Sequence, residues 1–132
     1  MARHATGTFH NTGWEETPVE ERDGSEKTTR ARISQRFSGD IEADGTWDAV
    51  MYYRPDGTAV YAGYLRLTGA IGPGEGTVVI DAHGTYDGGE ARSSWSVVPG
   101  SGGGGLSGLS GEGTTAAPHG PDGTYELDYE LE

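Results

Sequence analysis

The chain has 132 residues, a formal net charge of −12 and no cysteine. Such an acidic chain repels phosphate backbones and anionic surfaces, so neither nucleic acid nor a membrane is expected as a partner. The lack of cysteine excludes disulfides, thiolate nucleophiles and cysteine-ligated zinc. The length predicts one domain over residues 1–132, and the start of the chain has no apolar core of signal-peptide length, so a soluble cytoplasmic protein is expected.

Apolar and polar residues alternate with a period of two in the N-terminal half, which predicts strands rather than helices. Three strands and their turns are expected there: one around Phe9 that continues past Trp14, one at 29–37 before an interruption at 38–40, and one at 47–53 after a turn at 43–45.

The same pattern continues through the C-terminal half, where Gly, Pro and Asp mark the turns at 55–57, 72–74 and 87–89. Strands are expected at 58–68, 76–86, 91–98, 106–112 and 125–131. The segment 58–68 has apolar groups on both faces. This predicts that part of the outer surface is covered, so self-association into a homo-oligomer is expected.

A glycine-rich segment precedes the last strand, and eight of the fourteen residues at 100–113 are glycine. Leu106 and Leu109 interrupt it, and patterned strands flank it, so it is not interpreted as a flexible linker. Glycine allows sharp turns and close backbone approach at the corner of a curved sheet. With about eight strands and no helical periodicity, the sequence predicts an all-β, eight-stranded antiparallel up-and-down barrel.

Several motifs carry a family resemblance over the chain from about Ala5 onward: Arg54-Pro-Asp-Gly-Thr-Ala-Val-Tyr-Ala-Gly63, His83-Gly-Thr-Tyr-Asp-Gly88, and Trp95 to Gly102 with the glycine-rich segment. The chain resembles a bacterial family of unknown function whose members are built like allene oxide cyclase. The glycine-rich pattern is also similar to that of dirigent proteins. The resemblance implies an eight-stranded barrel that needs no cofactor and binds a hydrophobic small molecule inside. No cysteine matches the one near the allene oxide cyclase pocket.

Gln35 is the first candidate catalytic residue because it lies between Ile33 and Phe37 on the face of its strand predicted to be buried. A buried amide needs partners, so Gln35 can orient a carbonyl or hydroxyl of a ligand. The alternative is a hydrogen bond to a neighbouring tyrosine or to an internal water.

Two charged residues complete the catalytic candidates. Glu15 follows Trp14, and a carboxylate beside a tryptophan at a barrel mouth can have a raised pKa and act as acid or base. A solvated acidic loop is the favoured alternative, since six acidic residues occur between positions 15 and 26. Arg66 lies between two leucines, and if it points inward it would bind a substrate carboxylate.

Aromatic residues supply the candidate pocket wall, since Trp and Tyr combine an apolar body with a polar tip that fixes ligand orientation. The candidate ligand-binding residues are Trp14, Phe37, Trp47, Tyr53, Tyr64, Trp95, Tyr125 and Tyr129. Among these, Trp95 is the first choice for a purely structural role in the core.

The histidines do not suggest a metal site. His4, His10 and His119 lack ligand-like spacing, and the pair His83 and Asp81 is expected on the outer face. No metal or cofactor is therefore predicted.

The preferred function is that of a cofactor-independent cyclase or isomerase acting on a hydrophobic small molecule such as a secondary metabolite. The alternative is a non-catalytic protein that binds a lipophilic small molecule. A third is a structural module whose barrel is filled by its own side chains.

Overall fold

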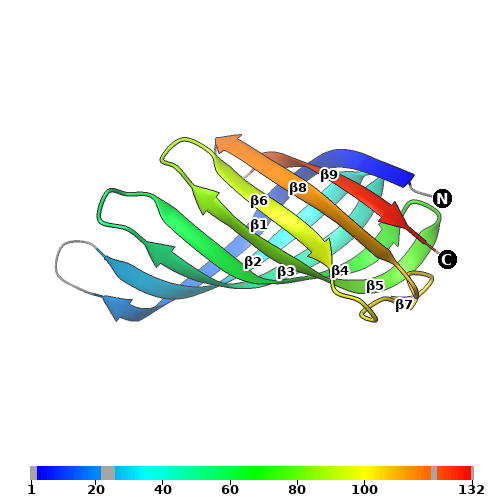
Figure 1. Cartoon of the computed structure of the whole chain (residues 1–132), viewed down its shortest axis with the longest axis horizontal. Coiled ribbons are helices and arrows are strands. Elements are labelled where there is room, and N and C mark those ends of the chain that lie inside the picture. Colours follow the sequence, from blue (N-terminus) through cyan, green and yellow to red (C-terminus); the bar gives the residue numbers. More distant parts are fainter. Residues whose placement is uncertain (1–2, 22–25, 120–121, 132) are drawn as a thin grey trace.

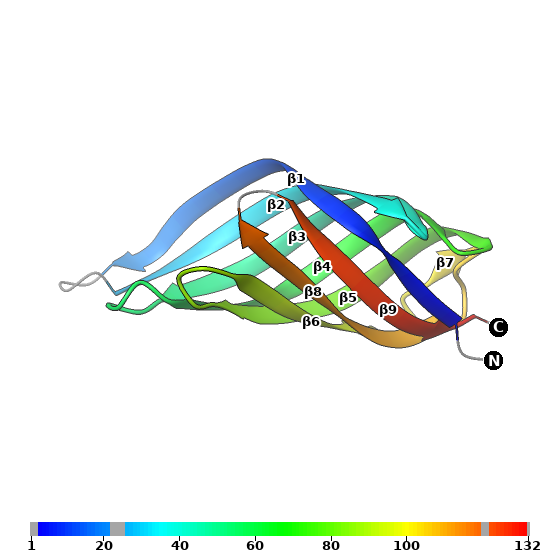
Figure 2. The same ribbon diagram turned by 90° about the horizontal axis from the view of Figure 1, so that it is seen from above.

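The computed structural model describes residues 3–21, 26–119 and 122–131. These residues form one antiparallel sheet that closes into a barrel, which confirms the predicted fold (Figures 1 and 2). The strands are β1 (Arg3–Glu21), β2 (Lys27–Gly39), β3 (Ile41–Tyr53), β4 (Ala59–Ile71), β5 (Gly74–Tyr86), β6 (Ala91–Val97), the two-residue β7 (Gly103–Gly104), β8 (Ser110–His119) and β9 (Asp122–Glu130). No helix capable of spanning a membrane occurs in the described ranges.

The barrel has an up-and-down order, in which each long strand pairs with its neighbours in sequence and β9 returns to pair with β1. Alternation of side chains sets the two faces, as β2 shows most clearly. Ile33 and Phe37 are buried, while Arg32 and Arg36 are exposed. Apolar residues therefore fill the interior of this part of the barrel, and the charged residues of β2 lie outside.

The turn between β2 and β3 lies earlier than the sequence analysis placed it. Ala43 to Gly45, predicted as a turn, belongs to β3, and the chain reverses at residues 38–40 instead, where Gly39 has a φ of 108°. Gly45 points inward: a Cβ there would lie 2.9 Å from a ring carbon of Phe37. Glycine is required at position 45 for close packing rather than for a turn.

The glycine-rich segment is folded, as predicted, but the strand assigned within it was misplaced. The expected strand at 106–112 is a turn until residue 109, and β8 runs from Ser110 to His119. Leu106 and Leu109 are 1% and 3% exposed, and they anchor the turn in the core. The turn lies at the end of the barrel that carries both chain ends (Figures 1 and 2). This end is thus closed by apolar side chains.

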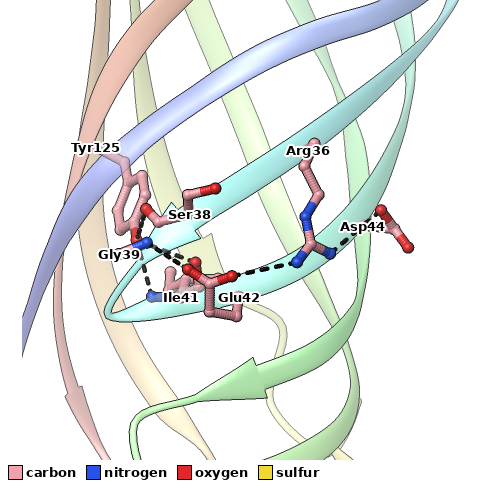
Figure 3. Close-up of polar contacts among 7 residues, drawn as sticks. All are labelled: Arg36, Ser38, Gly39, Ile41, Glu42, Asp44 and Tyr125. Carbon is pink, nitrogen blue, oxygen red and sulfur yellow. Dashed lines mark hydrogen bonds and ion pairs between the residues drawn. The ribbon is translucent and has the colours of Figure 1, made fainter.

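Tyr125 connects β9 to the β2–β3 turn by hydrogen bonds, in the half of the barrel that Leu106 and Leu109 close (the closed half). Its hydroxyl accepts a hydrogen bond from Ile41 N–H at 2.8 Å and donates to the Ser38 carbonyl oxygen at 2.9 Å (Figure 3). On the same turn, Glu42 accepts hydrogen bonds from the backbone N–H of Gly39 and from Arg36 (Figure 3). The turn is therefore held from within by a tyrosine and from outside by a carboxylate.

The outer face of β3 and β4 retains exposed apolar groups. Val50 is 50% exposed and Tyr64 is 60% exposed, so no described segment of the chain covers them. The self-association expected from the two-faced apolar segment at 58–68 stays a prediction.

Candidate functional site

A cavity of about 90 Å³ lies inside the barrel, toward the end where the β3–β4 and β5–β6 turns lie. Trp14 is among its lining residues and is 51% exposed, so the cavity reaches the surface beside this indole. The half of the barrel formed by β1 to β4 extends beyond the β5–β6 turn (Figures 1 and 2). One wall of the mouth is therefore longer than the other.

The lining is mainly apolar and aromatic. It comprises Phe9, Asn11, Trp14, Ile33, Gln35, Phe37, Trp47, Met51, Tyr61, Leu65, Ala82, Ala91, Ser93, Trp95, Thr115 and Ala117. The floor is a cluster of rings in which Phe37 lies 5.6 Å from Trp95 and Trp95 stacks on Tyr125 at 6.0 Å, measured between ring centroids. The packing of these rings determines the shape of the cavity on the side away from its mouth.

The side-chain amides of Gln35 and Asn11 form a polar pair in this lining. Gln35 is 9% exposed, and its Nε2 donates a hydrogen bond to Asn11 Oδ1 at 2.9 Å. The two residues are register partners on β2 and β1, and both line the cavity. The prediction that Gln35 is buried on the inner face is confirmed. Its protein partner is an asparagine and not the neighbouring tyrosine that was considered from the sequence.

A β-bulge in β1 determines which residues reach the mouth. The register shifts between Asn11 and Gly13, so the inward positions change from odd numbers to even numbers. Phe9 is buried before the bulge, and Trp14 lies opposite the inward Ile33 after it. Glu16 in turn lies opposite the buried Ala31. Without the extra residue, Glu15 and not Glu16 would face inward.

Glu16 joins three strands at the mouth. Its carboxylate accepts hydrogen bonds from Trp14 Nε1 at 2.9 Å, Thr29 Oγ1 at 2.5 Å and Tyr53 Oη at 2.5 Å. Burial alone would raise the pKa of Glu16, but these three hydrogen bonds outweigh it and hold the pKa below its ordinary value. Burial and the bond to Glu16 raise the pKa of Tyr53 to about 12. Glu16 is thus a fixed anion that holds Trp14 at the opening.

The structure brings together five of the residues predicted from sequence. Gln35, Trp14, Phe37, Trp47 and Trp95 all line the cavity. Trp95 therefore has a place in the lining as well as in the core.

The other predicted tyrosines are not among the residues that line the cavity. Tyr53 contacts Glu16 at the mouth, while Tyr125 and Tyr129 are buried in the closed half, where the Tyr129 hydroxyl packs against Gly72. Tyr64 is exposed on the outer face of β4.

The two charged catalytic candidates are outside the barrel, so neither has the inward placement that its catalytic role requires, and the exposure of Glu15 agrees with the solvated alternative that the sequence favoured. Arg66 is exposed because its neighbours Leu65 and Leu67 occupy the inner face, at 1% and 0% exposure. Glu15 is exposed because the bulge turns Glu16 inward in its place. Residues 22–25 of the acidic stretch, and the side chain of His119, lie outside the described part of the chain.

Three residues of the site were not among the candidates predicted from sequence: Tyr61 and Asn11 in the lining, and Glu16 at the mouth. Tyr61 follows from the alternation of β4, since it shares odd numbering with the buried Leu65 and Leu67. Asn11 likewise shares odd numbering with the buried Phe9. Glu16 had no comparable signal, because the bulge after Asn11 changes the inward face without any mark in the local pattern. His83 and Asp81 lie on the outer side, with His83 exposed, as the sequence analysis expected.

The lining of the cavity is poor in titratable groups. Its lining, as far as the chain is described, includes no carboxylate, lysine, arginine or histidine. Tyr61 is its titratable group, and burial raises the pKa of this phenol. Within the described ranges, no group of three or more histidine and acidic side chains is arranged to hold a metal ion.

Comparison with known proteins places the chain among proteins without an assigned role. The model of a family described as "Protein of unknown function (DUF3224)" matches residues 5–129. A crystal structure of a protein of unknown function from the DUF3224 family of Shewanella oneidensis MR-1 is similar, with a TM-score of 0.80 and 25% sequence identity. The similarity covers 100% of this chain and 98% of that one. No curated protein matches the sequence.

Proposed function

Because the chain belongs to the DUF3224 family of unknown function, we propose its function from the cavity itself: the protein binds a small apolar molecule in the open half of its barrel. The observation that carries this proposal is an apolar, aromatic cavity that reaches the surface beside Trp14. Pockets of this composition, with a few polar groups, are typical of small-molecule sites. The kinship with allene oxide cyclase suggested by the sequence motifs is part of this proposal and agrees with an interior ligand.

The size of the cavity limits the ligand. Its volume of about 90 Å³ is smaller than the roughly 150 Å³ that holds benzene in an enclosed protein cavity. The occupant is therefore a single small ring that extends from the cavity into its mouth, or the end of a longer molecule with the remainder at the mouth beside Trp14. A long polyene does not fit as a whole.

Filling the cavity tests this proposal. Ala117 lines the cavity, so Ala117→Leu should abolish binding of benzene, followed as saturable shifts of the methyl resonances of Leu65 and Ala82. Ala62→Leu adds the same atoms on the exposed face and should leave binding unchanged. Circular dichroism of both variants confirms that they are folded. Absence of saturable shifts in the wild type, or full binding by folded Ala117→Leu, would contradict the proposal.

The cyclase or isomerase activity expected from the resemblance stays a prediction. Such an enzyme would act by holding its substrate in a reactive conformer and polarising one oxygen, a role for which Gln35 is placed in the lining. Native mass spectrometry of the freshly purified protein separates the two functions. A co-purified ligand that is returned unaltered supports binding, whereas conversion of an added ligand beyond the no-protein control supports catalysis.

A further inference from the structure

Trp47 presents an unpaired hydrogen-bond donor in the cavity wall. The residue lies on β3, lines the cavity and is 8% exposed. Its Nε1 is buried and has no hydrogen-bond partner among the described residues. An indole N–H is a donor only, so its assignment does not depend on an amide flip or on a tautomer.

An unpaired buried donor is uncommon, since most buried polar atoms are hydrogen-bonded and each exception calls for an explanation. The neighbouring aromatic ring is that of Tyr61, whose centroid lies 5.1 Å from that of Trp47 with the rings at 81°. An aromatic face accepts hydrogen bonds more weakly than a carbonyl oxygen does. The indole N–H therefore has no strong acceptor among the described residues, but Nε1 itself is out of contact with solvent, so an acceptor in the cavity reaches it only if the Trp47 or Tyr61 ring shifts as the ligand enters.

The charges around the cavity indicate which kind of hydrogen-bond acceptor can bind to Trp47 Nε1–H. No cationic side chain is among the described lining residues, so a carboxylate would enter without a counter-ion. At the mouth, the Glu16 carboxylate is held as an anion by its three donors. Both features disfavour an anionic ligand, such as a fatty acid bound by its head group.

We propose that the ligand is a neutral molecule with a carbonyl or ether oxygen on a compact apolar body, and that Trp47 Nε1–H donates the hydrogen bond that selects this oxygen. This inference rests on the proposed function, since it names the class of ligand for the same cavity. Trp47 is then the specificity-determining residue of the site. The Gln35–Asn11 amide pair, Ser93 and Thr115 are further polar residues of the same lining.

Two probes of matched shape test the role of Trp47. Cyclopentanone has a carbonyl oxygen where methylenecyclopentane has a CH₂ group, and both have six heavy atoms, about the size that the cavity admits. The chain has three tryptophans, so its indole N–H signals are few, and Trp47→Phe identifies the one from Trp47. Binding is followed by the methyl resonances of Leu65 and Ala82, and the hydrogen bond by the proton shift of Trp47 Nε1–H.

Both probes should shift the cavity methyl resonances, and only cyclopentanone should move the Trp47 N–H proton downfield. Cyclopentanone should bind about fivefold more tightly, as expected of one hydrogen bond. The preference should vanish in Trp47→Phe and persist in Trp95→Phe, which removes another indole from the same lining. Cyclopentanecarboxylate should bind more weakly than either neutral probe.

The outcomes separate this inference from the function on which it rests. If both neutral probes shift the methyl resonances equally and the Trp47 N–H signal does not move, Trp47 Nε1–H does not bind the ligand oxygen. The inference about the ligand class is then wrong, while the proposed binding function stands. Tighter binding of cyclopentanecarboxylate would also overturn it. If neither neutral probe shifts the methyl resonances in the wild type, the proposed binding function fails, and the inference falls with it.

Discussion

The indole N–H of Trp14 donates a hydrogen bond to the carboxylate of Glu16 at 2.9 Å, and both residues follow the bulge in β1. The same carboxylate accepts hydrogen bonds from Thr29 on β2 and Tyr53 on β3. One anion thus links three strands at the mouth and fixes the indole beside the cavity.

Glu16→Gln should destabilise the protein at pH 7 by roughly 1–3 kcal/mol, because charge-assisted hydrogen bonds become neutral ones or are lost. The pKa of Glu16 is lowered in the folded state, so its contribution is present above its ordinary pKa of 4.5 and is lost as the pH falls through the folded value. The difference between wild type and variant in urea unfolding should therefore shrink between pH 6 and pH 3. Glu15→Gln, at the exposed neighbouring position, is the control and should change little at either pH. Parallel stability curves for Glu16→Gln and wild type would contradict this role.

Tyr125→Phe should reduce the free energy of unfolding by roughly 1–3 kcal/mol, since it leaves the N–H of Ile41 and the carbonyl of Ser38 without their hydroxyl partner in a buried place. Denaturant unfolding measures the loss. Tyr64→Phe removes the same atom from a side chain that is 60% exposed and should stay within about 0.5 kcal/mol of wild type. Equal effects of the two substitutions would mean that the hydroxyl of Tyr125 does not hold the turn.

Gly63→Ala should destabilise the barrel by roughly 3 kcal/mol or prevent folding, because an added Cβ would lie 1.9 Å from the Asp48 carbonyl oxygen of the neighbouring strand. Backbone atoms on β3 cannot give way without breaking the ladder between β3 and β4. Gly89→Ala, where the new Cβ has the Asp87 carboxylate oxygen 3.8 Å away, should be neutral or slightly stabilising. Thermal unfolding of the two variants distinguishes them, and a stable Gly63→Ala would refute the close approach.

Asp128→Asn should lower the pKa of His4 toward its ordinary value of 6.5, because the hydrogen bond to Asp128 is the main cause of its raised pKa. The contribution of this pair to stability is present below pH 6.5 and is lost as the pH rises through the folded pKa. NMR titration of the His4 ring measures the change directly. Asp44→Asn removes a carboxylate that pairs with Arg36 instead, and the His4 titration should not change in that variant.

The sequence by itself determined the all-β barrel and the inner face of most strands. Alternation with a period of two decides burial locally, so Gln35, Phe37, Trp47 and Trp95 were predicted as interior residues before their neighbours were known. Leu106 and Leu109 similarly indicated that the glycine-rich segment folds against the core.

Only the tertiary structure decided where the barrel is open and which polar groups meet there. The bulge in β1 exchanges Glu15 for Glu16, and a bulge depends on pairing with β2, which no local pattern records. The contact between Asn11 and Gln35 joins residues 24 positions apart. Trp47 Nε1 lacks a hydrogen-bond partner among the described residues, and this depends on the side chains that several strands bring around it. Alternation is a property of one strand, whereas register and the pairing of polar atoms are properties of several strands together, and these shape the candidate site.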